Sequence, residues 1–62
     1  MPTWKLVLKA RREQVERAEA ELRRALEEGD LDAADFARIW LGEAHLAVQQ
    51  IVDRYPQAAQ ER

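Results

Sequence analysis

The stretch RRALEEGDLDAADF, residues 23–36, decides how the chain folds because it ends one helix and starts another. The residues before Gly29 are strong helix formers, and a glycine at that place is typical of the position just past a helix C-terminus. The stretch therefore predicts a short turn at residues 29–31 with a helix on either side.

The second helix is predicted to start directly after this turn. Asp32 suits the N-cap position, and Asp35 then lies at the third helical position, in an acidic variant of the capping box. In the same register Leu31 precedes the cap and Phe36 is the fourth helical residue, which is the spacing of a hydrophobic staple. We expect this cap and staple to fix the angle at which the second helix begins.

Outward from the turn, the first helix is predicted to cover residues 3–28 and the second residues 33–55. Pro56 ends the second helix because proline disfavours the α conformation in the residue before it. The tail, residues 56–62, has no large side chain to bury and is expected to fray. Two helices of similar length joined by a short turn make an antiparallel helical hairpin, so we expect one all-α domain over residues 1–62.

A single hairpin of this size has little to stabilise it. The chain has 62 residues, no cysteine and one histidine, so neither a disulfide nor a structural zinc site is available. Ordering such a chain costs roughly 90 kcal/mol, which a small core barely offsets. The composition, 47% hydrophobic and 35% charged, is that of a chain that folds. Oligomerisation is therefore the expected source of stability.

Several classes of function are disfavoured by what the sequence lacks. It has no serine and no cysteine, and Thr3 is its only threonine, so the nucleophiles of acyl-transfer enzymes are nearly absent. No constellation of residues predicts a metal site or another cofactor. No apolar run approaches the ~18 residues of a membrane span, and no signal-peptide core follows the start. We therefore expect a cytoplasmic, non-catalytic protein without a cofactor or membrane contact.

The apolar faces of the two helices differ in width. The apolar stripe of the first helix is roughly 100° wide, whereas that of the second covers roughly 160°, more than one neighbouring helix can bury. Exposed apolar surface on this scale usually marks an interface. The simplest cover is a second hairpin related by a two-fold axis, which gives a homodimeric four-helix bundle. The expected dimer core consists of Val15, Ala18, Leu22, Trp40, Leu41, Ala44, Val48 and Ile51.

In length and layout the chain resembles the Rop-type RNA-regulatory hairpins. The resemblance is architectural, and no RNA-contacting motif of that family is matched residue by residue, so no site is carried over. It implies a dimeric bundle and, as an alternative function, binding of nucleic acid.

A second apolar strip lies on the far side of the second helix. Ile39 and Leu46 are seven residues apart, opposite the main apolar face, and Gly42 lies between them. Glycine inside a helix costs ~1 kcal/mol relative to alanine, which invites a packing explanation. Our hypothesis is that this strip contacts another helix at close range. The alternative is that these are ordinary surface hydrophobic residues beside a tolerated glycine.

The N-terminal segment is basic. Lys5, Lys9, Arg11 and Arg12 precede the first acidic residue, and such a cluster can contact phosphates. The rest of the first helix interleaves arginines with glutamates, which is typical of a solvated face, and the net charge of −2 argues against binding through overall charge. A nucleic-acid-binding dimer that uses this segment is the alternative function.

Residues 3–9 fit two kinds of secondary structure. Trp4 and Leu8 lie on one side of a strand, but they are also four apart, as on one face of a helix. We favour the helix because no turn residue separates the segment from the helical stretch after it. As a strand, the segment would make the chain resemble a ribbon-helix-helix DNA-binding dimer, with outward-facing Lys5, Val7 and Lys9.

Three further features have structural interpretations. Arg11 falls within the apolar stripe of the first helix, where it either sets the register, with Asp53 in reach, or extends into water at the open end. His45 lies at the margin of the apolar arc and is interpreted as a boundary residue rather than a metal ligand. Trp4 and Tyr55 are expected to meet and close the open end.

From these observations we expect a small protein-protein interaction or regulatory protein. It is predicted to bind a second copy of itself, as a homodimer or a higher oligomer, and another protein through the second helix.

Overall fold

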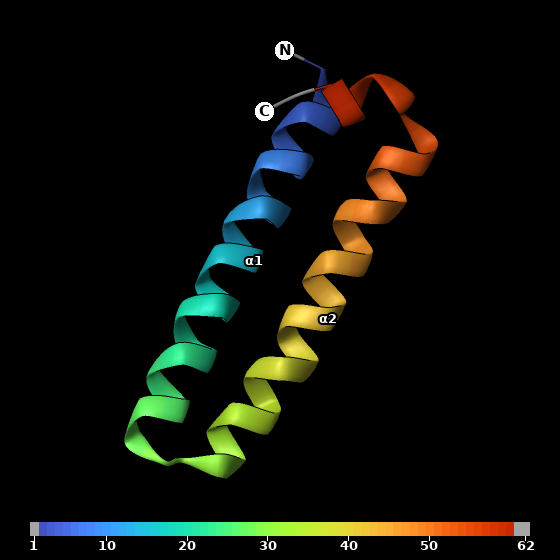
Figure 1. Ribbon diagram of the computed structural model, residues 1–62. Helices are drawn as coiled ribbons and strands as arrows, with labels where there is room; N and C mark the ends of the chain where they lie inside the picture. Colours follow the sequence, from blue (N-terminus) through green and yellow to red (C-terminus); the bar gives the residue numbers. More distant parts are fainter. Residues whose placement is uncertain (1, 61–62) are drawn as a thin grey trace.

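The computed structural model describes residues 2–60, which form an antiparallel helical hairpin (Figure 1). Helix α1 covers Thr3–Glu28, helix α2 covers Leu31–Arg54, and a short 3-10 helix, η1, covers Pro56–Gln60. The hairpin measures 40 × 16 × 16 Å. No strand occurs within residues 2–60, so the prediction of an all-α hairpin is confirmed for that part of the chain.

The turn that joins the helices has the backbone of a Schellman motif. Gly29 adopts the left-handed conformation with φ of 69°, as predicted for the residue after the first helix. Its N–H donates to the carbonyl of Leu26 at 3.2 Å, and the N–H of Asp30 donates to the carbonyl of Ala25 at 2.9 Å. These two bonds satisfy carbonyl groups that the end of α1 would otherwise leave without a partner.

The predicted cap of the second helix is wrong by two residues. Asp30 is the N-cap, and its carboxylate accepts a hydrogen bond from the N–H of Ala33 at 3.1 Å. Asp32 lies inside the first turn of α2 instead, where a negative charge still interacts favourably with the helix dipole. The predicted staple does not form, because Leu31 and Phe36 are 71% and 76% exposed. The connection is therefore shorter than predicted, with Gly29 and Asp30 between the helices.

The end of the chain also differs from the prediction. Helix α2 ends at Arg54, one residue earlier than predicted, and the N–H of Tyr55 caps it by donating to the carbonyl of Ile51 at 2.8 Å. Residues 56–60 do not fray but form η1, in which Ala58 is fully buried. A small side chain can anchor a segment when the backbone of that segment also forms hydrogen bonds. The predicted fraying of residues 61 and 62 lies outside the described residues.

The interior of the hairpin is built almost entirely from alanine. Within residues 2–60 one large side chain is buried, that of Leu8, which is 2% exposed. Small side chains allow two helices to approach closely, because the distance between helix axes depends on the residues at the contact. The other buried residues are Ala18, Ala25, Ala34, Ala37, Ala44 and Ala58.

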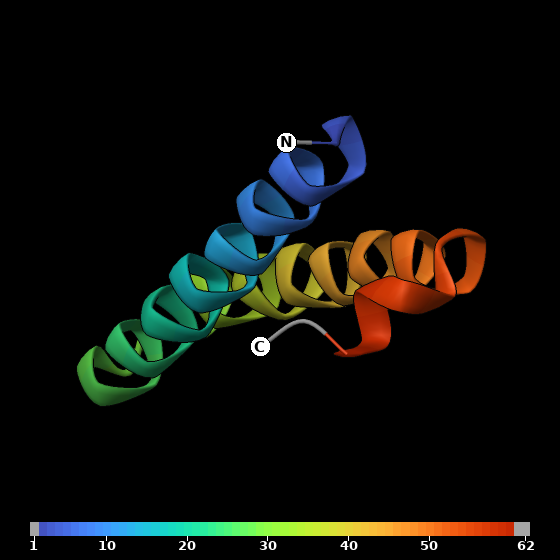
Figure 2. The ribbon, with the colours of Figure 1, turned by 90° about the horizontal axis from the view of Figure 1, so that it is seen from above.

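The helices lie further apart at the open end than beside the turn (Figures 1 and 2). Aromatic rings occupy this wider end, where Trp4 stacks on Tyr55 with 5.6 Å between ring centroids and 14° between their planes. This contact confirms the predicted meeting of the two aromatic residues. Residues 3–9 are part of α1 rather than a strand, which removes the ribbon-helix-helix alternative.

Candidate interaction surfaces

An apolar groove runs between α1 and α2 along one side of the hairpin. Near the turn it has a hollow of 480 Å³, lined by Leu22, Leu26 and Leu41. Towards the open end it continues into a hollow of 310 Å³, lined by Val15 and Val48. We refer to the surface formed by these five aliphatic residues as the groove.

Charged side chains border the groove. Glu19 and His45 line both hollows and therefore lie where the two meet. Arg23 borders the hollow near the turn, while Arg12 and Glu16 border the other. An aliphatic floor with a charged rim is the arrangement of a protein-protein interface. His45 occupies the boundary position that the sequence predicted.

A different hollow, of 360 Å³, lies on the other side of the hairpin. Trp40 borders it from α2, and Arg11 and Arg17 border it from α1. Trp40 is 38% exposed. Because consecutive residues on a helix point about 100° apart, Trp40 faces away from the groove that Leu41 lines. The lining of this hollow is more polar than the linings of the two hollows in the groove.

The eight residues predicted for a dimer core occupy four environments. Ala18 and Ala44 are buried within a single hairpin, and Ile51 is half-buried. Trp40 lies on the side opposite the groove. The four that line the groove, and would meet a second hairpin docked there, are Val15, Leu22, Leu41 and Val48.

The predicted strip on the far side of α2, formed by Ile39, Gly42 and Leu46, is open to solvent. We call it the outer strip. Ile39 and Leu46 are 60% and 59% exposed, and a Cβ added to Gly42 would meet no atom within 4 Å. No contact within the hairpin therefore explains the glycine. Phe36 is 76% exposed and borders the strip, because it lies three residues before Ile39 on the same helix.

The four basic residues of the N-terminal segment are not gathered on one surface. Lys5, Lys9 and Arg12 share one side of α1, whereas Arg11 points about 100° away from Arg12. Arg11 donates a hydrogen bond from Nη1 to Oε1 of Gln14 at 3.1 Å. Its predicted neighbour Asp53 accepts instead from Gln49 Nε2 at 2.8 Å.

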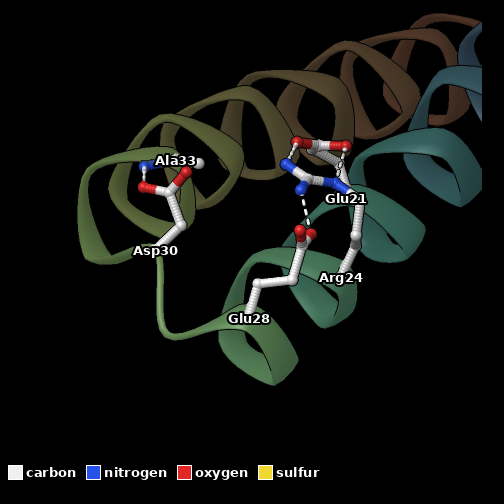
Figure 3. A network of polar contacts seen from close by, with 5 residues as sticks. All are labelled: Glu21, Arg24, Glu28, Asp30 and Ala33. Atoms are coloured by element: carbon white, nitrogen blue, oxygen red, sulfur yellow. Dashed lines mark hydrogen bonds and ion pairs between the residues drawn. The ribbon is translucent and has the colours of Figure 1, made fainter.

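Arg24 bridges two glutamates on the surface of α1 close to the turn (Figure 3). Its Nε donates to Glu21 Oε2 at 3.0 Å, its Nη2 donates to the other oxygen of that carboxylate, and its Nη1 donates to Glu28. These hydrogen bonds lower the pKa of Glu21 and raise the pKa of Arg24. Because all three side chains are exposed, the network supports the helix rather than forming a site.

Within residues 2–60, no group of three or more histidine, aspartate or glutamate side chains is placed to hold a metal ion. Across the same residues, neither long helix has an apolar stretch sufficient to cross a membrane. No family model, curated protein or solved structure matches this chain. The surfaces themselves are therefore the basis for a functional proposal.

Proposed function

We propose that this chain is a non-catalytic interaction protein that works as a homodimer, with two hairpins packed through the groove into a four-helix bundle. The observation that carries this proposal is the interior of the single hairpin, in which Leu8 is the one large buried side chain within residues 2–60. Burying an alanine methyl removes little apolar surface from water, so such an interior contributes little hydrophobic stabilisation.

The accessible surface supports the same proposal. The chain exposes 4758 Å², whereas a folded monomer of 7.2 kDa exposes about 4100 Å². A second hairpin laid along a face of 40 × 16 Å covers about 640 Å² on each copy, or about 1300 Å² in total. That area lies within the range of specific interfaces, which start at about 1000 Å². The surface that one hairpin exposes beyond that of a typical monomer is thus about as large as the area that a second hairpin would cover.

The outer strip supplies the surface for a partner protein. It points about 120° away from the groove around α2, so a hairpin docked in the groove leaves it open. Ile39 and Leu46 offer apolar contacts, and Gly42 lets a helix backbone approach closely between them. The dimer therefore carries two such strips, one on each copy, and presents them to a helical partner.

Light scattering over a dilution series tests the dimer. We expect the mass of two chains at high concentration and dissociation on dilution, with loss of helix as the single hairpins lose stability. A folded, cooperatively melting monomer throughout the series contradicts the proposal.

The double change Ile39→Glu and Leu46→Glu tests the outer strip. We expect the variant to remain a folded dimer, because both side chains point into solvent, but to lose any larger assembly or partner binding. Leu22→Glu is the matched control, since it places a charge in the groove and is expected to break the dimer. If the outer-strip variant loses helix or fails to dimerise, as the control is expected to, the strip belongs to the core instead.

A further inference from the structure

The hairpin carries opposite charge at its two ends. Residues 3–12 contain four basic residues and no acidic one, and they lie at the open end. Residues 16–42, the half of the hairpin that contains the turn, contain eight acidic and four basic residues, a net charge of −4. Residues 13–15 and 43–54 add three acidic residues and one basic residue to the open half, which therefore has a net charge of +2. The molecule is therefore a rod with a positive end and a negative end.

We infer that the second copy docks on the groove with its turn at the opposite end of the bundle. This inference rests on the proposed dimer and adds its orientation. Turns at the same end would bring the two positive ends together and the two negative ends together. Turns at opposite ends place each positive end beside a negative one. Because the Debye length is about 8 Å at physiological ionic strength, the charges that decide between the two are those close to the interface.

The orientation also fixes which helices meet. With the turns at opposite ends, α1 packs against α1 of the second copy, and the two run antiparallel. If the two copies of α1 overlap along their full length, the two-fold axis lies at the midpoint of Thr3–Glu28, between Val15 and Glu16, and residues whose numbers add up to 31 lie opposite each other. Arg12 then lies opposite Glu19 of the second copy, and the pair occurs twice. Both residues border the groove.

With the turns at the same end, α1 instead packs against α2 of the second copy. Arg12 and Glu19 are then no longer opposite each other across the interface. A measurement that detects pairing between these two positions therefore distinguishes the two orientations.

Mixing two charge-reversed variants provides that measurement. Arg12→Glu places two acidic residues at each contact and Glu19→Arg places two basic ones, so each variant alone is expected to dimerise roughly tenfold more weakly than the natural chain. An equimolar mixture restores both pairs, and heterodimers are expected to form with close to the natural affinity. Lys9→Glu and Glu13→Arg, which make the same changes of charge away from the groove, are the matched controls and should show no recovery on mixing.

The experiment is sedimentation equilibrium at 150 mM salt, with helix content checked by circular dichroism. Recovery in the Arg12/Glu19 mixture but not in the control mixture supports the opposite-end dimer. Absence of recovery, or equal recovery in both mixtures, overturns it.

A distance measurement tests the same orientation without altering the groove. Because the chain has no cysteine, Asp32→Cys places a single spin label beside the turn. Turns at opposite ends separate the two labels by about the 40 Å length of the hairpin, while turns at the same end bring them within about 20 Å. The long distance supports the inference. The short distance overturns the orientation but leaves the dimer intact, whereas a monomer at all concentrations overturns the proposed function itself.

Discussion

Leu26 and Leu46 give a matched test of the dimer, because they are the same residue type with similar exposure in one hairpin. Leu26 lines the groove and is 49% exposed, while Leu46 lies on the outer strip and is 59% exposed. Fully burying a leucine contributes about 1.5–3 kcal/mol, so covering the exposed half of Leu26 contributes about 1 kcal/mol per chain. Leu26→Ala is therefore expected to weaken the dimer by about 2 kcal/mol, a rise in Kd of roughly thirtyfold.

Leu46→Ala is the control for this change. Both substitutions replace a leucine in a helix with alanine, so their effects on helix propensity are alike. We expect Leu46→Ala to leave the Kd for dimerisation unchanged, because the outer strip does not face the second hairpin in the proposed dimer. Sedimentation equilibrium gives the Kd of each variant, and the concentration dependence of the melting temperature checks it independently. Equal Kd values for the two variants would falsify the groove as the dimer interface.

Three further changes test local features of the hairpin. Asp30→Ala removes the cap of α2 and is expected to lower the free energy of unfolding by about 1 kcal/mol, measured by thermal or urea unfolding. Asp32→Ala, at the position predicted for the cap from the sequence, should lower it clearly less. Equal losses of stability in the two variants would contradict the assigned cap. Gly42→Ala is expected to stabilise the hairpin by up to about 1 kcal/mol, since a Cβ there meets nothing within 4 Å, and a loss of stability would show that another chain packs against this position. The hydrogen bond from Arg24 lowers the pKa of Glu21, so Glu21 stabilises the fold above its ordinary pKa and this contribution is lost as the pH falls through the lowered value. In Arg24→Gln, an NMR titration should find the Glu21 pKa returned upward, and an unchanged value would exclude Arg24 as the cause.

Much of the hairpin was predictable from local signals. Gly29 ends α1 because a left-handed residue is needed there and glycine adopts that conformation without strain. The pairing of Trp4 with Tyr55 follows from the antiparallel arrangement, which brings the ends of the two helices together. These predictions succeeded because each depends on a few neighbouring residues or on the length of a helix.

The cap of α2 was missed because two aspartates compete for it. Asp30 and Asp32 have the same side chain and the same capping ability, and the choice between them depends on where the turn leaves the backbone. The bond from the Asp30 N–H to Ala25 places the Asp30 carboxylate within reach of the Ala33 N–H. Sequence spacing favoured Asp32 because a cap at that position would also allow a hydrophobic staple between Leu31 and Phe36. In the structure Phe36 points into solvent and forms no staple.

The amino-acid sequence by itself determined two helices, the turn between them and an excess of apolar surface on the second helix, because helix periodicity and glycine geometry are local properties of the chain. Only the tertiary structure decided how that surface is divided. The alanines bring α1 and α2 so close near the turn that the larger aliphatic residues are excluded from the space between them. Leu22 and Leu41 therefore line an open groove on one side, Trp40 lies on the other, and Ala58 of η1 folds back into the interior. The distance between two helices depends on all the side chains at their contact together, which no single stretch of sequence specifies.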